Sequence, residues 1–492
     1  MLFNSYSFIF LFLPLALIGY FGLNRAGKQK AAVSFLLLMS LGFAGLGGVY
    51  HLAVLLVNLL ANYMLAGWMR DGGKKRRKKI LMLGILFNLG ILFLFKYYNF
   101  FAENINKVFG GGLILHQLAL PLGISFYTFA QIAYLVDCYK ADKEERGSGI
   151  YSYSLLEYSA YVSFFAKLIQ GPIAYHNEVI PALRDPQTKK VDFINLSKGM
   201  YAFALGLAKK VLLADTLAKI VNIGYNNIDA LNTGDAILVM VCYSLQIYFD
   251  FSGYCDMAYG IGYMLNIKLP VNFNSPYKSV SITDFWNRWH MTLTRFFTRY
   301  LYIPLGGNRK GKVRTMINIM IVFLLSGLWH GANWTFILWG ALNGIVMVLE
   351  RIMNVKEWKI LPGIRRVAAF VFAAFAWSIF RADSISQVKS LWGRLLTGGH
   401  GFYAPFADCF NGLVEICILH RIGFGVLIEK YPCCLLLLFI IVLVLACFLM
   451  RNTQEKVETM QFKNSQAVVT VILIVWCIMS LSEISEFIYF NF

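Results

Sequence analysis

Long apolar runs, separated by short polar or basic segments, set the pattern of this chain. A helix needs about 20 mostly apolar residues to cross the roughly 30 Å hydrocarbon core of a membrane. The pattern therefore predicts an all-α polytopic membrane protein with roughly 11–13 transmembrane or re-entrant helices. The predicted spans lie near residues 7–23, 31–49, 51–69, 80–98, 119–138, 199–224, 235–262, 314–332, 334–350, 367–380, 433–450 and 466–484.

Two segments do not fit a simple crossing. Residues 151–170 are apolar but run into Gln170-Gly171-Pro172, so we expect a re-entrant or interfacial helix there. The stretch 381–432 is predicted to be a long loop outside the membrane. Because the sequence shows no internal repeat and no low-complexity linker, we expect one domain over residues 1–492, with a motif core at 246–343 and an aromatic tail at 485–492.

Composition agrees with a lipid environment. Hydrophobic residues make up 58% of the chain and charged residues only 14%, whereas a soluble domain is nearer a quarter charged. Aromatic residues reach 16%, as expected where aromatic side chains form belts at both membrane interfaces. These proportions exclude a soluble globular protein.

The formal net charge of +19 does not indicate a nucleic-acid partner, because the basic residues lie in short clusters such as 25–30, 74–79 and 309–314. Such loops mark the cytoplasmic side of a membrane protein and attract anionic lipid headgroups. With these loops inside, the alternation of spans puts both termini outside. The nine cysteines show no CxxC or Cys/His spacing, so we expect neither a metal site nor a disulfide framework.

Residues 246–343 differ from the rest because polar groups occur inside apolar runs. Asp250 is the clearest case, since a carboxylate at bilayer depth costs about 2.5–3.5 kcal/mol and needs a partner or a wet cavity. Two interpretations stay open. Asp250 either pairs with a cation such as Arg288 and fixes helix packing, or it takes a direct part in catalysis.

A polar, aromatic segment follows. At helical spacing Trp286, Trp289 and Leu293 share a face, which predicts a short helix at the cytoplasmic interface. A basic cluster comes next and could hold the phosphates of a nucleotide-like donor. It is equally well explained as a loop that only sets topology. The cluster consists of Arg309, Lys310, Lys312 and Arg314.

The sharpest chemical signal is His330, at the end of an apolar span and next to small residues. Imidazole titrates near neutrality, so it can take the proton of a hydroxyl that attacks a thioester or ester. A histidine that only bridges two helices is the alternative. Ionisable residues inside membranes are usually functional, and we therefore interpret His330 as a catalytic base.

Four motifs now carry a resemblance: Asp250-Phe251-Ser252-Gly253-Tyr254, Asp284-Phe285-Trp286-Asn287-Arg288-Trp289-His290, Tyr302-Ile303-Pro304-Leu305-Gly306-Gly307-Asn308-Arg309 and Gly327-Leu328-Trp329-His330-Gly331. In this order they resemble the signature segments of the membrane-bound O-acyltransferase family, in particular its bacterial alginate and peptidoglycan O-acetyltransferase branch. The likeness extends to about residue 380. The chain departs from that branch at Ala166-Lys167 and at Ala174-Tyr175-His176, which leaves the acceptor open.

The resemblance implies a multi-pass enzyme of the bacterial plasma membrane, with a ring of helices around a central tunnel. It makes His330 the catalytic histidine and His290 a second, supporting residue, with Asp250, Arg288 and Asn333 behind them. The implied donor is a cytoplasmic thioester such as acetyl-CoA, without a permanently bound cofactor. The implied acceptor is a cell-surface or secreted polysaccharide, reached with an extracytoplasmic SGNH-type, esterase-like partner.

The last residues, 487–492, resemble the aromatic C-terminal acylation motif of the small partner protein in teichoic acid D-alanylation. In that interpretation Tyr489 is an acyl carrier. An interfacial aromatic belt explains the same residues, and both stay open. Two other classes of protein compete with the enzyme: a transporter or flippase for a lipid-linked glycan, and a non-catalytic assembly subunit. The transporter is less favoured than the enzyme, because the two related halves expected of many transporters are absent from the sequence.

Overall fold

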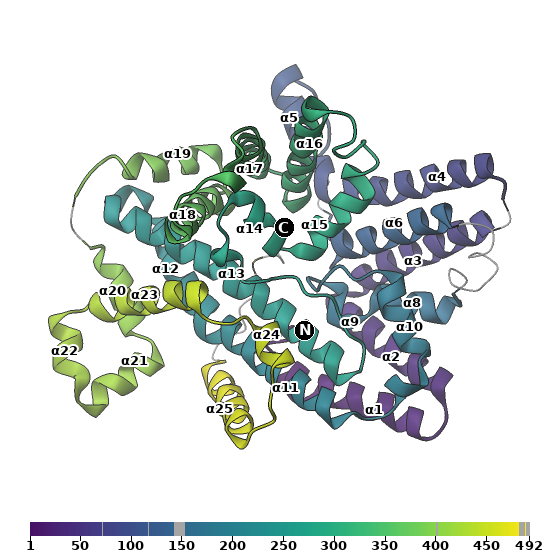
Figure 1. Cartoon of the computed structure of the whole chain (residues 1–492), viewed down its shortest axis with the longest axis horizontal. Helices are drawn as coiled ribbons and strands as arrows, with labels where there is room; N and C mark the ends of the chain where they lie inside the picture. Colours follow the sequence, from purple (N-terminus) through teal and green to yellow (C-terminus); the bar gives the residue numbers. More distant parts are fainter. Residues whose placement is uncertain (71, 117, 142–152, 400–401, 482–487, 489–492) are drawn as a thin grey trace.

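The computed structural model describes residues 1–70, 72–116, 118–141, 153–399, 402–481 and 488, and within these ranges it holds helices and no β-strand (Figure 1). The predicted all-α polytopic membrane fold is confirmed. Seven of the described helices are long and apolar enough to cross a membrane: Phe8–Arg25, Val49–Arg70, Lys74–Phe109, Thr233–Met264, Lys312–His330, Trp334–Ile352 and Pro362–Arg381.

The N-terminal part is a layer of helices in which α3, α4 and α6 lie side by side (Figure 1). The predicted spans coincide with helices throughout this part. In α4 to α5 the helix continues through a π-helical turn, η2, a type of bulge that is frequent at functional sites. The elements are η1 (Phe8–Phe12), α1 (Leu13–Arg25), α2 (Gln29–Gly45), α3 (Val49–Arg70), α4 (Lys74–Leu92), η2 (Phe93–Tyr97), α5 (Tyr98–Phe109) and α6 (Ile124–Lys140).

The apolar segment before the Gly-Pro turn is broken into two short helices, α8 (Leu155–Ser163) and α9 (Phe165–Leu168). Ser154 starts α8 with a capping box, in which its side chain and that of Glu157 satisfy each other's backbone N–H groups. Nine helical residues span roughly 13 Å, too short for a crossing. The described part of this segment therefore fits the predicted re-entrant or interfacial helix, and α10 (His176–Arg184) follows it.

Helix α13 (Thr233–Met264) forms the centre of the molecule and is almost entirely buried. It packs against the continuous stretch made by α11, η4 and α12 on one side, and against α18 on another (Figure 1). A span surrounded by protein no longer faces lipid, so polar groups can be held inside it. The flanking elements are α11 (Phe193–Ala208), η4 (Lys209–Ala214), α12 (Asp215–Asn226) and α18 (Pro362–Arg381).

Helices α16 (Lys312–His330) and α17 (Trp334–Ile352) form a tight antiparallel pair. Gly327 faces the carbonyl of Phe336, and Gly340 faces the carbonyl of Phe323, so a Cβ at either glycine would clash with backbone. The close approach fixes the end of α16, which carries the motif with His330.

The predicted interfacial helix at 286–293 is wrong. The chain forms two short helices, α14 (Ile282–Arg288) and α15 (Met291–Phe297), and both Trp286 and Trp289 are buried. Trp289 stacks with Phe285 at 5.5 Å. Contacts of these indoles with other rings stabilise the buried position. A regular helix cannot continue from one to the other, because Trp289 is extended and the next residue, His290, has a positive φ.

The segment 381–432, predicted as a long loop outside the membrane, is largely helical in its described residues, and none of these helices is long enough to cross a membrane. Ser384 caps α19 through the backbone N–H of Gln387, and Val388 and Leu391 are buried. Capped segments with one apolar face fold as helices against a core. The helices of this segment are α19 (Ile385–Arg394), α20 (Ala404–Asn411), α21 (Val414–Leu419), η9 (His420–Phe424) and α22 (Gly425–Lys430).

Three helices complete the C-terminal part: α23 (Cys434–Leu449), α24 (Thr453–Glu458) and α25 (Asn464–Ser480). The first and last of them match the two final predicted spans. Both are apolar but shorter than the seven spanning helices.

Candidate active site

His330 is the last residue of α16, and only 3% of it is exposed. Its ring lies edge-on against Trp339 at 5.2 Å and Phe380 at 5.1 Å. Trp339 belongs to α17 and Phe380 to α18, so these two helices and α16 itself enclose the imidazole. The aromatic walls hold the ring in one place and exclude most water from one side of it, which strengthens electrostatic effects there.

His290 lies between α14 and α15 and is 1% exposed. Its backbone is left-handed, with φ 44° and ψ 51°, a conformation that is uncommon outside glycine. Its Nδ1 lies 2.9 Å from Oδ1 of Asn272, and its Nε2 has no hydrogen-bond partner among the described residues. Burial lowers the pKa of the His290 imidazole to about 3, so the ring is neutral at physiological pH.

The two histidines belong to one site. Trp329 is near both of them, with its ring 4.9 Å from that of His330 and 6.2 Å from that of His290. The two imidazoles are close enough to act on each other electrostatically. The sequence interpretation that places both in one centre is consistent with this geometry.

Lys96 is a neighbour of this centre that the sequence interpretation missed. Its Nζ donates to the carbonyl oxygen of Trp329 at 2.5 Å and lies 3.5 Å from Oγ of Ser125. The ammonium is also near enough to His330 to act on it electrostatically. The available signal was a lysine at the end of the predicted span 80–98, because an ionisable residue inside an apolar run indicates function.

Asp250 pairs with a cation, as one of the two open interpretations has it, but the cation is Lys210 and not the suggested Arg288. Lys210 Nζ lies 2.7 Å from Oδ1 of Asp250 and 2.9 Å from Oδ1 of Asp215. Lys210 belongs to the π-helical turn η4, which packs directly on α13. The second carboxylate oxygen of Asp250 accepts the backbone N–H of Ile488 at 3.0 Å.

The other residues expected behind the histidines have their own partners. Arg288 donates through Nε to Asp284 at 2.9 Å, one helical turn away on α14. Asn333 is the N-cap of α17, where its Oδ1 accepts the backbone N–H of Thr335 and its Nδ2 donates to the carbonyl of Asp383. Neither makes a direct polar contact with the two histidines among the described residues.

The predicted donor-binding cluster lies at the start of α16. All four of its cations are exposed, and none forms an ion pair with a described residue. Their charges are thus available to phosphates. The length of α16 separates Lys312 from His330 by roughly 27 Å. The cluster comprises Arg309, Lys310, Lys312 and Arg314.

A pocket reaches the polar side of the site from another direction. Its lining includes Asn272, whose amide oxygen is the partner of the His290 ring, and Asn452 from the start of the α24 segment. Lys209 and Asp256 also line it and form an ion pair at 2.6 Å, so their charges offset each other. The pocket therefore borders the partner of His290, and its lining carries no net charge.

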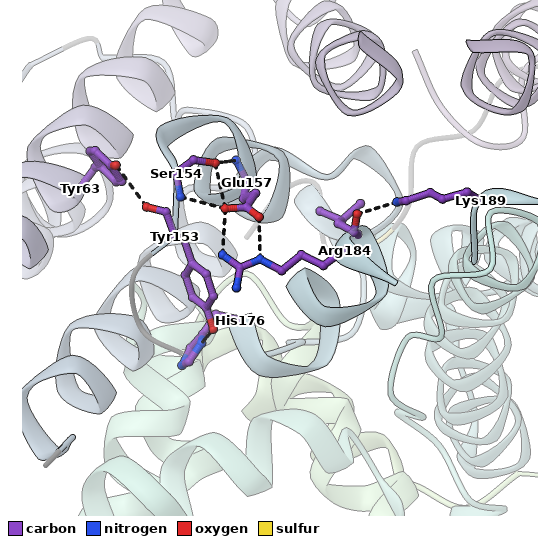
Figure 2. A network of polar contacts seen from close by, with 8 residues as sticks. Tyr63, Tyr153, Ser154, Glu157, His176, Arg184 and Lys189 are labelled. Atoms are coloured by element: carbon purple, nitrogen blue, oxygen red, sulfur yellow. Dashed lines mark hydrogen bonds and ion pairs between the residues drawn. The ribbon is translucent and has the colours of Figure 1, made fainter. Parts of the chain in front are cut away.

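A separate polar network joins α8 and α10 (Figure 2). Glu157 accepts two hydrogen bonds from the Arg184 guanidinium, whose proximity lowers the pKa of Glu157 to about 2. Nδ1 of His176 forms a hydrogen bond with the Tyr153 hydroxyl at 2.8 Å. Nε2 of the same ring lies 3.4 Å from Oδ2 of Asp137. The sequence interpretation noted His176 as a departure from relatives but not as part of this network, in which His176, Tyr153 and Asp137 are buried.

Lys167, the other departure, is buried in α9 with its ammonium 4.4 Å from the centre of the Tyr161 ring. Burial lowers the pKa of this amine to about 7. It lines a pocket with Phe126, Tyr127 and Ala174.

The nine cysteines are free thiols, and the described residues contain no group of His, Cys, Asp and Glu that could hold a metal ion. Tyr489, the expected acyl carrier, lies outside the described residues. Its neighbour Ile488 is described and packs on the apolar cluster around α13.

Together, the buried helical spans and the enclosed histidine pair define a polytopic membrane protein with an imidazole centre in its interior. A family model described as MBOAT, membrane-bound O-acyltransferase family, matches residues 36–386. The chain belongs to this family and is an acyltransferase of the bacterial plasma membrane, as the motifs predicted.

Individual relatives are similar over most of the chain. The peptidoglycan O-acetyltransferase of Helicobacter pylori is 36% identical over 522 residues, which cover 100% of this chain and 98% of that protein. The probable alginate O-acetylase of Pseudomonas aeruginosa is 36% identical over 406 residues, covering 81% of this chain and 75% of that protein. The teichoic acid D-alanyltransferase of Bacillus subtilis is 27% identical over 280 residues, which cover 54% of this chain and 69% of that protein.

Proposed function

We propose that this enzyme takes an acetyl group from a cytoplasmic thioester, acetyl-CoA, and delivers it across the membrane for O-acetylation of a cell-surface or secreted polysaccharide. Similarity to a peptidoglycan O-acetyltransferase and to a probable alginate O-acetylase supports a glycan acceptor. The observation that carries the proposal is the pair His330 and His290, both buried and both near the ring of Trp329.

In this proposal His330 is the general base. It takes the proton of the attacking hydroxyl as the oxygen–acyl bond forms and the acyl–sulfur bond breaks, and the proton then passes to the leaving thiolate. His290 orients the acceptor beside it. Asp250, Arg288 and Asn333 would act only by holding the surrounding helices in position.

The acyl group also needs a route to its final acceptor outside the cell. We propose that an extracytoplasmic SGNH-type, esterase-like protein completes the transfer to the polysaccharide. No permanently bound cofactor is needed, because the thioester itself supplies the activated acyl group.

The test of the proposed function is donor consumption by the purified protein in proteoliposomes. With acetyl-CoA labelled in the acetyl group, we expect the protein to release free CoA, and we expect label to move to an added glycan in equal amount once the extracytoplasmic partner is also present. A flippase for a lipid-linked glycan would move its substrate without releasing CoA. Release of CoA no greater than that in liposomes without the protein would contradict the proposal.

The basic cluster at the start of α16 is proposed to hold the donor's phosphates. Changing Arg309, Lys310 and Lys312 together to glutamine should raise the apparent KM for acetyl-CoA more than it lowers kcat. The lost contacts with the phosphates stabilise the bound donor and the transition state equally, so their loss weakens binding without slowing the chemical step. Added salt should weaken donor binding less in this variant than in the original protein. Steady-state kinetics at several ionic strengths measure both effects.

A matched control for that variant is available in another exposed basic loop. Lys74, Lys75 and Lys78 are also exposed at the start of α4, and their replacement by glutamine removes the same charge far from the motifs. An equal rise in KM in both variants would assign the α16 cluster to membrane topology alone.

Tyr489 is proposed as an acyl carrier on the external side. Tyr489→Phe keeps nearly all of the apolar area and removes only the hydroxyl, so it separates a carrier from an anchor. We expect the variant to bind donor but to fail in polymer acetylation, and mass spectrometry of the original protein to find an acetyl group on the C-terminal peptide. Full acetylation by Tyr489→Phe would reduce the tail to an anchor, and Phe490→Leu provides the control for lost aromatic area.

A further inference from the structure

A chain of hydrogen bonds leads from the turn before α10 to His290. The backbone N–H of Ile173 donates to Oγ1 of Thr292 at 3.0 Å, and Thr292 Oγ1 lies 2.9 Å from Oδ1 of Asn272. The same Asn272 oxygen lies 2.9 Å from Nδ1 of His290. The Asn272 side chain thus holds the segment of His290 and Thr292, and Thr292 links it to Ile173.

The direction of each bond in this chain follows from its fixed donors. The backbone N–H of Thr292 points at the same atom of Asn272 at 3.2 Å; since a backbone N–H can only donate, that atom is the amide oxygen. The amide nitrogen then faces Sγ of Cys255 at 3.2 Å. Thr292 Oγ1 already accepts from Ile173, so its own proton points to the Asn272 oxygen.

This orientation determines where the proton sits on His290. An amide oxygen can only accept, so Nδ1 of His290 must carry a hydrogen. A neutral imidazole carries one N–H, and Nε2 is therefore a bare nitrogen with a lone pair. That nitrogen is buried and lacks a hydrogen-bond partner among the described residues, an arrangement that is unfavourable unless a ligand completes it.

We propose that Asn272 and Thr292 are positioning residues that hold His290 with its proton on Nδ1, so that Nε2 accepts a hydrogen bond from a hydroxyl of the acyl acceptor. This inference rests on the proposed function and specifies how His290 serves it. A hydroxyl of the acceptor that donates to Nε2 of His290 is held beside the thioester, where His330 acts as the base. The site is thereby matched to a hydroxylated acceptor.

The alternative tautomer would not serve this purpose. With the hydrogen on Nε2, the ring would direct its lone pair at the Asn272 oxygen and would offer a donor where the acceptor's O–H arrives. Fixing the tautomer of a catalytic imidazole through a neighbouring oxygen is an established source of large rate effects in serine proteases.

The experiment reads the tautomer directly. In the full-length protein, labelled with ¹⁵N-histidine and reconstituted in lipid, the signals of His290 are identified by their loss in His290→Gln. We expect its Nδ1 in the range of protonated ring nitrogens and its Nε2 in that of bare ones. In Asn272→Leu we expect a mixture of both tautomers. A protonated Nε2 in the original protein would overturn the inference.

Activity provides the second readout. Asn272→Leu should lower kcat for acetyl transfer from acetyl-CoA at least about tenfold, equivalent to about 1.4 kcal/mol of barrier, while the KM for acetyl-CoA stays unchanged. Thr292→Val should do the same more weakly, and Thr292→Ser, which keeps the hydroxyl, should retain activity. The matched control is Asn195→Leu, at the start of α11. Among the described side chains, the amide that it removes bonds only to Asn266.

The outcomes separate this inference from the proposed function. If Asn272→Leu and Asn195→Leu have equal kcat, the positioning role is excluded while acetyl transfer stands. If the original protein transfers no acetyl group from any thioester, the proposed function fails, and the NMR result still decides the tautomer on its own.

Discussion

Replacing His330 by alanine is expected to reduce acyl transfer by about 10²- to 10⁴-fold, the range that a general base contributes. That factor corresponds to roughly 3–5 kcal/mol of activation free energy. The imidazole is buried among Trp329, Trp339 and Phe380, so no other base can take its place from solvent. Donor turnover and polymer acetylation, at equal protein amounts, measure the effect.

Two further variants make this result specific. His330→Gln fills more of the space than alanine does and also lacks a base, so it should be as inactive while better preserving the packing. His116→Ala removes an exposed histidine and should keep full activity. Activity of His330→Gln within about threefold of the original would remove His330 from the role of base.

Replacing Lys210 by methionine is expected to have the largest effect on stability. Lys210 is buried between Asp250 and Asp215, and removing one partner of a buried ion pair costs about 3–5 kcal/mol because the remaining charge is unpaired. We expect a lower Tm in detergent and a smaller folded fraction after membrane extraction. Loss of activity should follow loss of folded protein.

A double variant then separates structure from catalysis at Asp250. Lys210→Met with Asp250→Asn removes both charges of the pair and keeps an oxygen for the backbone N–H of Ile488. If the pair only fixes helix packing, the double variant should recover much of the lost stability and remain active. A folded but inactive double variant would assign Asp250 a direct part in the reaction.

The motifs in the middle third of the chain are enough to identify the family, because several polar residues in fixed order inside apolar runs are rare by chance. His290 and His330 were recognisable as candidates for that reason. The partners of His290 were not, since Asn272 precedes it by eighteen positions in the chain and Thr292 reaches Ile173 across 119 residues. No local pattern marks an amide oxygen as the end of such a chain of hydrogen bonds.

Errors in the sequence interpretation came from pairings between distant segments. Arg288 was suggested as a partner of Asp250 because it lies in the motif at 284–290. Its guanidinium is instead held by Asp284 on its own helix. Lys210 reaches Asp250 only because α11 and η4 pack along α13. Trp286 and Trp289 have the spacing of an interfacial helix, yet they are buried because Trp339 and Trp377 lie against them.

By itself, the sequence determined the membrane class and most helical spans and singled out the two histidines, because hydropathy and motif order are properties of contiguous residues. The tertiary structure alone decided which helix is central, which cation neutralises Asp250, that Lys96 borders the site, and which side-chain oxygen faces Nδ1 of His290. Each of these depends on distances between segments far apart in the chain. Packing of side chains sets those distances, and one-dimensional patterns do not encode them individually.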